Sequence, residues 1–517
     1  MNLLDKIISA VSPSTGLKRY QARLAGEMVK RQYDAAIEGG RRNGGWGRPK
    51  TKAEDEVAKA ADKLAATAQD LTRNTPLGHR IKMIWPSNIA GSGIRAEINI
   101  PGTSKRAGTQ RRKLNDDFIM WAESTDCDFD GHYDLYGLQW LWSATIVESG
   151  GVLIRKHVST NTPGANAMMT AALPLKLQTM EQTMLDNAVV TPKVTGHRVR
   201  SGIEFDTLGA VYGYHIKSGF DDRDSIFLRK GEECIHLFRK ERPGQHLGVS
   251  WLSHSATMIQ KYDTLTDAKL LQDQIAACMG VLIEGAETSI GIHGKGNESE
   301  QIEELEPGMV QYVAPGSKVH TITPPSSQGS QAFVETVRAD IATGADLAYT
   351  QVTGDYSKLN FASGRMSKIE FFQMLDYAQR LMLKPGLDIV FLWYKQLSLL
   401  KNGSSIQNAT VTWTYPPRAV VQPKEELDVL IKKVRSGFES PSSASKSLGT
   451  NLETTVEQWR RDKATFAEMP FDIDPSLFSE AGNQLNTDDA ASANTDSSTD
   501  KDSADGSDTN TDEGNQP

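Results

Sequence analysis

The sequence predicts an α+β protein in which a mixed, mainly antiparallel sheet region is followed by long helices. Between residues 145 and 238, short apolar runs alternate with glycine and turn residues, a pattern typical of strands. From residue 250, apolar side chains recur three and four positions apart with no glycine or proline until Gly280, which predicts one long helix. The 517 residues suffice for about two to four domains.

Charge is distributed unevenly along the chain. The formal net charge is −8, and residues 481–517 hold one lysine and nine acidic residues, so this tail carries all of it. The first 120 residues hold 22 basic and 12 acidic side chains, which leaves residues 121–480 with an acidic excess. We therefore expect a basic N-terminal region, an acidic central region and a C-terminal tail too polar to build a core.

Several classes of function lack their sequence signals. Cys127, Cys234 and Cys278 are far apart without CxxC spacing, and the histidines show no HExxH motif. The sequence contains no Walker A loop, GxSxG elbow, kinase set or dinucleotide fingerprint. We expect no catalytic residues, no metal and no cofactor. Because no stretch of 18 apolar residues occurs, we also expect no membrane span, no secretory signal and a place in the cytoplasm.

Residues 1–52 are predicted to form a basic, flexible N-terminal arm. Between residues 17 and 52 the chain is rich in glycine and basic residues and has little apolar periodicity, which predicts an extended segment. A solvated loop and an anion-binding arm explain this pattern equally well. The candidate arm residues are Lys18, Arg19, Arg23, Lys30, Arg31, Arg41 and Arg42.

Helices and strands then alternate as far as residue 249. The periodicity predicts helices over residues 53–74, 76–85 and 113–121, with a strand at 94–100 between the last two. Around residue 132 a further helix is expected to lead into a hairpin, with strands at 145–147 and 152–154 joined by Gly150 and Gly151. More strands are predicted at residues 173–177, 202–205, 211–216 and 233–238.

The long helix should pack on one side only. Its apolar positions are Met258, Tyr262, Leu265, Ala268, Leu271, Ile275 and Met279, and its opposite face is charged. A small unit follows, with strands at 281–283 and 309–313 around an acidic cluster made of Glu298, Glu300, Glu303, Glu304 and Glu306. We further expect helices at 331–345 and 365–399, an irregular polar stretch at 350–364, a strand at 409–415 and a helical region at 424–469.

Three motifs resemble the lambda-type family of tailed-phage portal proteins. Residues 70–76 read DLTRNTP and 88–94 read NIAGSGI, similar to the family pattern RDLxRNNP…NVVGxGI. Residues 238–245 read FRKERPGQ and lead into GVSWL at 248–252. Residues 349–357 read YTQVTGDYS, similar to YxxLTGDYSxxNYSSxR, although Phe361, Ala362 and Gly364 depart from that pattern. The resemblance spans residues 20 to about 470.

The resemblance implies a portal fold assembled as a ring, with a mixed α/β wing, long stem helices, a small α/β clip and a helical crown. By order along the chain, it implies an N-terminal arm at 1–52 and a wing at 53–249. Next come a stem helix at 250–279, a clip at 280–325, a second stem helix at 326–349 and a tunnel loop at 350–364. The chain ends with a long helix returning to the wing at 365–423, a crown at 424–470 and a disordered acidic tail at 471–517.

The resemblance also implies the function. Such a protein is a portal protein that forms a dodecameric ring at one capsid vertex of the virion and is assembled in the host cytoplasm. Its channel conducts double-stranded DNA, independently of sequence, during packaging and ejection. The implied partners are the large terminase subunit, the major capsid protein and possibly scaffold, and head-completion or neck proteins. The acidic cluster at 298–306 would face terminase or neck proteins, or would simply be a solvated face.

A channel must contact DNA without holding it. Tight phosphate contacts release counterions and bind strongly, so a wall with few cations suits a moving duplex. The candidate channel residues are Tyr356, Ser357, Lys358, Asn360 and Arg365, in which Lys358 and Arg365 offer charge and the others neutral hydrogen bonds. Lys358 could equally be a solvated loop residue, and Arg365 could pair within its helix. The alternative functions are a DNA-processing enzyme of the packaging machinery and a non-channel capsid scaffold or adaptor.

Overall fold

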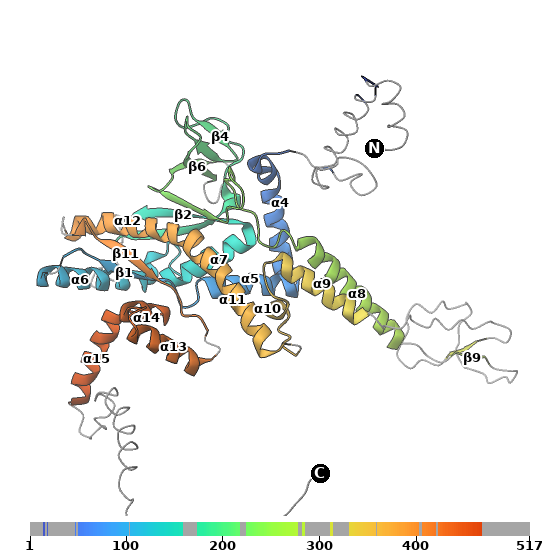
Figure 1. Cartoon of the computed structure of the whole chain (residues 1–517). Helices are drawn as coiled ribbons and strands as arrows, with labels where there is room; N and C mark the ends of the chain where they lie inside the picture. Colours follow the sequence, from blue (N-terminus) through green and yellow to red (C-terminus); the bar gives the residue numbers. More distant parts are fainter. Residues whose placement is uncertain are drawn as a thin grey trace, which may run out of the picture. The chain divides into compact units, whose positions relative to one another are not determined.

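The computed structural model describes residues 50–102, 104–158, 173–217, 224–277, 282–284, 311–313, 330–357, 359–402, 406–419 and 422–467, together with Ser14, Thr15, Lys18 and Gly47 (Figure 1). The chain divides into two compact units. The smaller one comprises residues up to 61 and residues 240–247, and the larger one holds the remainder.

In the smaller unit, helix α4 (Ala53–Asn74) begins with Glu54, Asp55 and Glu56, whose charges suit the positive end of the helix dipole. Glu56 also forms an ion pair with Arg242, with 2.5 Å between Oε2 and Nη1. Of the predicted arm residues only Lys18 is described, and it is helical and exposed. The other six arm bases lie outside the described residues.

The core of the larger unit forms around helices α5 (Pro76–Ile89) and α7 (Leu135–Ser149). Thr75 caps α5 by accepting a hydrogen bond from the Gly78 amide at 3.2 Å, and Pro76 occupies the first turn, where no donor is needed. The helix continues past the predicted end at Trp85. Helix α6 (Lys105–Ala122) starts eight residues before the predicted 113, because Ser104 caps its first turn.

The hairpin predicted around Gly150 is wrong. Residues 145–147 are the last part of α7, which ends where Gly150 adopts the left-handed conformation with φ of 89°. Strand β2 (Gly151–Val158) then begins directly. Ile146 and Val147 are both fully buried, and burial inside the core outweighs the preference of β-branched residues for strands.

The two larger sheets, in the middle of the chain, are antiparallel, as predicted. One has the order β3-β2-β8, formed by β2, β3 (Leu175–Glu181) and β8 (Cys234–Phe238). The second has the order β4-β5-β6-β7, with bounds Arg198–Arg200, Ile203–Phe205, Val211–Lys217 and Ser225–Arg229. A third pair joins β1 (Arg95–Asn99) to β11 (Thr410–Thr414). Strands β4 and β7 escaped the sequence analysis because they are short and half-polar.

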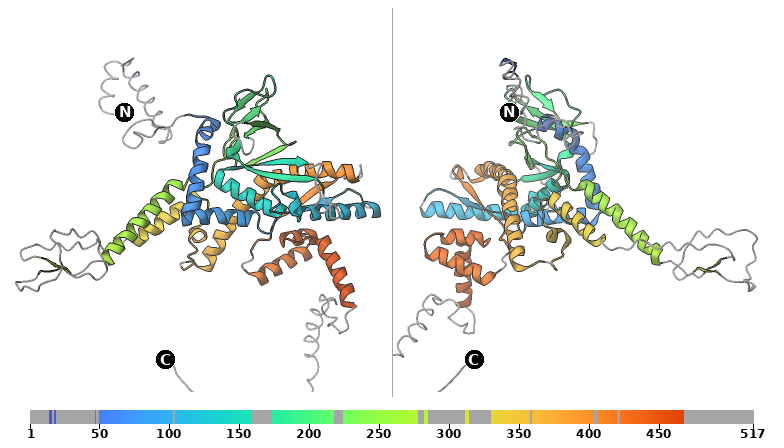
Figure 2. Two further views of the ribbon diagram at one scale, coloured as in Figure 1. Left: turned by 180° about the vertical axis from the view of Figure 1, so that it is seen from behind. Right: turned by 45° about the vertical axis from the view of Figure 1, so that its right-hand side comes forward.

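The long helices α8 (Ala256–Ala277) and α9 (Ser330–Gly344) run side by side (Figure 2). Ile259 and Ile341 are buried where the pair joins the core, and the Arg338 guanidinium donates two hydrogen bonds to the Tyr262 hydroxyl, at 2.8 and 2.6 Å. Leu265 and Leu271, which were predicted to pack, are exposed together with Leu270. Within one chain the predicted one-sided packing therefore holds only near the start of α8.

The described residues of the small acidic unit are two short strands. Strand β9 (Leu282–Glu284) pairs in parallel with β10 (Gln311–Val313), which agrees with the strands predicted there. The five glutamates of the acidic cluster lie outside the described residues.

The short helix α10 (Tyr349–Thr353) comes next. After a break, a continuous run of helix comprises α11 (Phe361–Tyr377), a π-helical segment (Ala378–Leu383) and α12 (Lys384–Asn402). Among the described residues after β11, the helices are α13 (Pro423–Arg435), α14 (Pro441–Ser447) and α15 (Leu452–Ala467). Among the described helices, none has the length and apolar character needed to cross a membrane.

A buried carboxylate organises the four-stranded sheet. The side chain of Glu204 accepts hydrogen bonds from the amides of Lys193 and Val194, at 2.8 and 3.2 Å, and contacts His197 Nδ1 and His215 Nε2, each at 2.9 Å. Because an ionised carboxylate only accepts, both ring nitrogens must carry a proton. Burial works to raise the pKa of Glu204, but these four hydrogen bonds outweigh it and leave that pKa lowered.

We expect Glu204→Gln to destabilise the sheet of β4 to β7 by about 2 kcal/mol, because an amide cannot accept all four hydrogen bonds. Since the pKa of Glu204 is lowered, the carboxylate stabilises the fold above its ordinary pKa of 4.5, and this contribution is lost as the pH falls through the lowered value. Hydrogen exchange of these strands from pH 7 to pH 3 measures both effects. The exposed Glu232→Gln serves as the control, and equal exchange in the two variants would contradict the expectation.

Candidate functional site

The segment between α10 and α11 is shaped by its own side chains. Gly354 ends α10 with φ of 72°, and its amide donates to the Thr350 carbonyl at 2.9 Å. The Asp355 carboxylate accepts from the amide and hydroxyl of Ser357, at 3.0 and 2.6 Å. Asn360 caps α11 by accepting from the Ser363 amide at 2.8 Å. The stretch predicted as irregular at 350–364 is therefore a loop only at 354–360, since both of its ends are helical.

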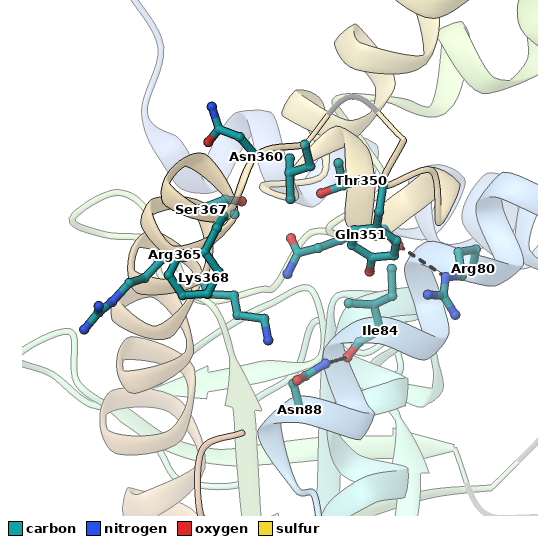
Figure 3. Close-up of a pocket in the computed structure, with 13 residues that line it drawn as sticks. Arg80, Ile84, Asn88, Thr350, Gln351, Asn360, Arg365, Ser367 and Lys368 are labelled. Atoms are coloured by element: carbon teal, nitrogen blue, oxygen red, sulfur yellow. Dashed lines mark hydrogen bonds between the residues drawn. The ribbon is translucent and has the colours of Figure 1, made fainter. Parts of the chain in front are cut away.

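This loop borders a pocket of about 460 Å³ whose walls are α5, α10 and the start of α11 (Figure 3). The residues of the lining are Arg80, Ile84, Asn88, Thr350, Gln351, Tyr356, Leu359, Asn360, Phe361, Gly364, Arg365, Ser367 and Lys368. They include three cations and several neutral polar groups but no carboxylate, histidine or cysteine.

The three cations come from two separate parts of the chain. On α5, Arg80 donates through Nε to the Gln351 carbonyl at 3.3 Å, which joins α5 to α10. Lys368, on α11, points into the space between α11 and α5, toward Asn88, whereas the Arg365 guanidinium points away from it (Figure 3). Arg365 donates through Nη1 to Gln422 Oε1 at 3.3 Å.

The predicted channel residues divide into three groups. Tyr356, Asn360 and Arg365 all line the pocket, although Asn360 and Arg365 also serve the local structure. Ser357 turns its hydroxyl toward Asp355 and is not part of the lining. Lys358 lies outside the described residues.

Sequence reasoning missed Arg80 and Lys368. Lys368 follows Arg365 by three residues on one helix, a spacing that could have indicated a shared face.

The pocket has the chemistry of an anion-binding surface. Arginine and lysine donate charge-assisted hydrogen bonds to phosphate or carboxylate oxygens, and the Asn and Gln amides add neutral donors. Within the described part of the chain, no group of three or more His, Cys, Asp or Glu residues could hold a metal ion.

We expect Asn360→Ala to destabilise the start of α11 by about 1 kcal/mol, because the Ser363 amide loses its acceptor. Asn360→Asp keeps the acceptor and improves the interaction with the helix dipole, so it should retain the stability. Hydrogen exchange of residues 361–366 distinguishes the two variants. If both variants exchange at the wild-type rate, Asn360 does not cap α11.

Residues 39–379 match the family model described as phage portal protein, lambda family. This match covers well over half of the chain, so the protein belongs to the lambda family of phage portal proteins, and the resemblance found in the sequence is confirmed. Among curated proteins, the chain is similar to the "Probable portal protein" of Halomonas phage phiHAP-1, with 22% identity over 444 residues that cover 81% of this chain and 83% of the relative.

Solved structures similar to the chain come from gene transfer agent (GTA) particles. One is titled "Neck of empty GTA particle computed with C6 symmetry", with a TM-score of 0.41 and 14% identity, covering 76% of this chain and 94% of the other. Another is titled "Neck of native GTA particle computed with C12 symmetry", with a TM-score of 0.39 and 15% identity over 76% of this chain and 94% of the other.

Proposed function

We propose that this portal protein forms a dodecameric ring at one capsid vertex, and that DNA passes through the ring during packaging and ejection. The observation that carries the proposal is membership of the lambda portal family over residues 39–379. The mature ring is part of the virion and is assembled in the host cytoplasm. The protein itself acts as a conduit and docking platform and not as an enzyme.

The pocket between α5 and α11 is the proposed DNA-facing site. Its cations, in a lining that holds no carboxylate, favour phosphate oxygens, and contacts to phosphate carry no direct information on base sequence. A channel requires each contact to be weak, because every phosphate that is neutralised releases counterions and strengthens binding. In a symmetric ring, a few cations per subunit become rings of charge that guide the duplex while it moves.

The remaining partners are assigned by charge. The acidic cluster at Glu298, Glu300, Glu303, Glu304 and Glu306 would dock basic surfaces of the large terminase subunit and later of neck proteins. The basic arm up to residue 52 would hold the capsid protein, scaffold or DNA.

Imaging of the purified full-length protein tests the ring directly. We expect negative-stain images to show closed rings of about twelve subunits around a central hole. A protein that stays monomeric would contradict the proposal and favour the adaptor. ATPase or nuclease activity of the pure protein would instead favour a DNA-processing enzyme.

The pocket is tested with Arg80→Ala and Lys368→Ala in assembled rings, and the predicted channel residue Lys358 is tested separately with Lys358→Ala. Each variant that removes a phosphate contact should weaken the affinity for DNA by the same factor for different DNA sequences. The fall of log affinity with log salt concentration should also become less steep, by about 1 in the slope. The exposed Lys105→Ala on α6 is the matched control. Rings of Arg80→Ala and Lys368→Ala that keep the wild-type salt slope and retain full-length genomes would exclude the pocket as a DNA contact.

A further inference from the structure

Helix α13 presents an apolar face that the described part of the chain covers only in part, since Leu430 and Val434 are half-buried while Leu427 and Ile431 are exposed. None of its residues is buried. Leu427, Leu430, Ile431 and Val434 follow one another at steps of three, one and three, so they share one face of the helix. Leu427 is 49% exposed and Ile431 is 40% exposed. A helix of 13 residues is marginal by itself in water, so this face needs a partner.

Helix α15 carries a second such face. Leu452, Val456 and Trp459 lie at steps of four and three, and therefore on one side. Val456 is 44% exposed and Trp459 is 65% exposed. The start of the helix is held to α6 by an ion pair between Glu453 Oε1 and Arg111 Nη2 at 3.0 Å. The anchored start leaves Trp459 as a large apolar side chain facing solvent.

The two faces do not cover each other within one chain. Helices α13 and α15 each contact the short α14, in which Ala444 is buried. Figure 1 shows α13 and α15 extending from opposite ends of α14. The exposed fractions of Leu427 and Trp459 confirm that both faces stay open.

The charges of the two helices are complementary in one orientation only. In α13 the first half holds Glu425, Glu426 and Asp428 beside one base, Lys424, and the second half holds Lys432, Lys433 and Arg435. In α15, Glu453 and Glu457 precede Arg460, Arg461 and Lys463, among which stands one acid, Asp462. Antiparallel packing places the acidic half of each helix beside the basic half of the other, whereas parallel packing brings like charges together. The same order of charges also suits each helix dipole.

We propose that α13 of one copy packs antiparallel against α15 of a neighbouring copy, with Leu427, Ile431 and Trp459 at the centre of the contact. Two different surfaces meet, so the contact is heterologous and repeats around a ring. The inference rests on the proposed ring and assigns a contact by which its subunits hold one another. A second copy fits better than another protein, because this chain supplies both apolar faces and both halves of the charge pattern.

Crosslinking of the full-length ring tests the contact. Glu426→Cys and Arg460→Cys are combined in a Cys278→Ser background and treated with a short bis-maleimide. Cys127 and Cys234 are buried, and burial raises the pKa of both thiols, so neither should react. We expect a ladder of covalent multimers longer than the dimer. Glu426→Cys with Thr454→Cys, which are close only in a parallel pair, should give no ladder.

Two aspartate substitutions test the apolar part of the contact between α13 and α15. Leu427→Asp with Trp459→Asp should abolish the ladder and raise the concentration needed for ring formation by about tenfold or more. The matched control is Leu208→Asp, since Leu208 is 92% exposed in a turn of the four-stranded sheet. Circular dichroism shows whether α13 and α15 keep their helicity in the monomer.

The possible results separate this inference from the proposed function. If the wild-type protein forms no ring, both fail. If it forms rings but the cysteine pair gives no ladder, or only a crosslink within one chain, the ring stands and the inference is overturned. A ladder found only after residues 468–517 are deleted would also overturn it, because that segment would then be the occupant of the faces.

Discussion

The packing around Trp85 is the interaction on which the site depends. Its indole ring contacts Trp251, with centroids 4.8 Å apart, and Phe371 of α11, at 5.3 Å. Its Nε1 donates to the Ala345 carbonyl, one residue after α9, at 3.2 Å. One side chain thus joins α5 to the segments that precede α8, follow α9 and form α11. Aromatic pairs of this kind add to the free energy of burial and also fix orientation. Both long walls of the pocket meet at this ring.

A second fixed point lies at the far end of α5. The buried amide of Gln379, in the π-helical segment, donates to the Ile89 carbonyl at 2.9 Å and satisfies an acceptor that the helix end leaves open. A π-helical turn is an irregular feature that often occurs at functional sites. Here the π-helical segment contacts the end of α5 through Gln379, and α11, which precedes it in the same helical run, lines the pocket. The cations of the pocket are therefore carried on rigid helices, and only residues 354–360 form a loop.

The molecule leaves apolar side chains uncovered at several places. Leu270 and Leu271 on α8, Met366 on α11 and Trp459 on α15 are all exposed, although each lies on a regular helix. Single exposed apolar residues are normal on protein surfaces, but faces of them on amphipathic helices are typical of contacts between proteins. In the proposed ring, neighbouring subunits would cover such faces. In that proposed ring, the exposed part of α8, which was predicted to pack, would be covered in the same way.

The sequence by itself determined the family, the α+β class and the helices with strong local periodicity. Helix α4 has its predicted bounds, and α9 differs by one residue at each end, because apolar spacing is a property of the local chain. Only the tertiary structure decided that residues 145–147 are helical and that Arg80 and Lys368 share a pocket with Tyr356. Local pattern cannot show which side chains are buried on every side, nor which cations meet across hundreds of residues. Both depend on packing between distant segments, which no single stretch of sequence contains.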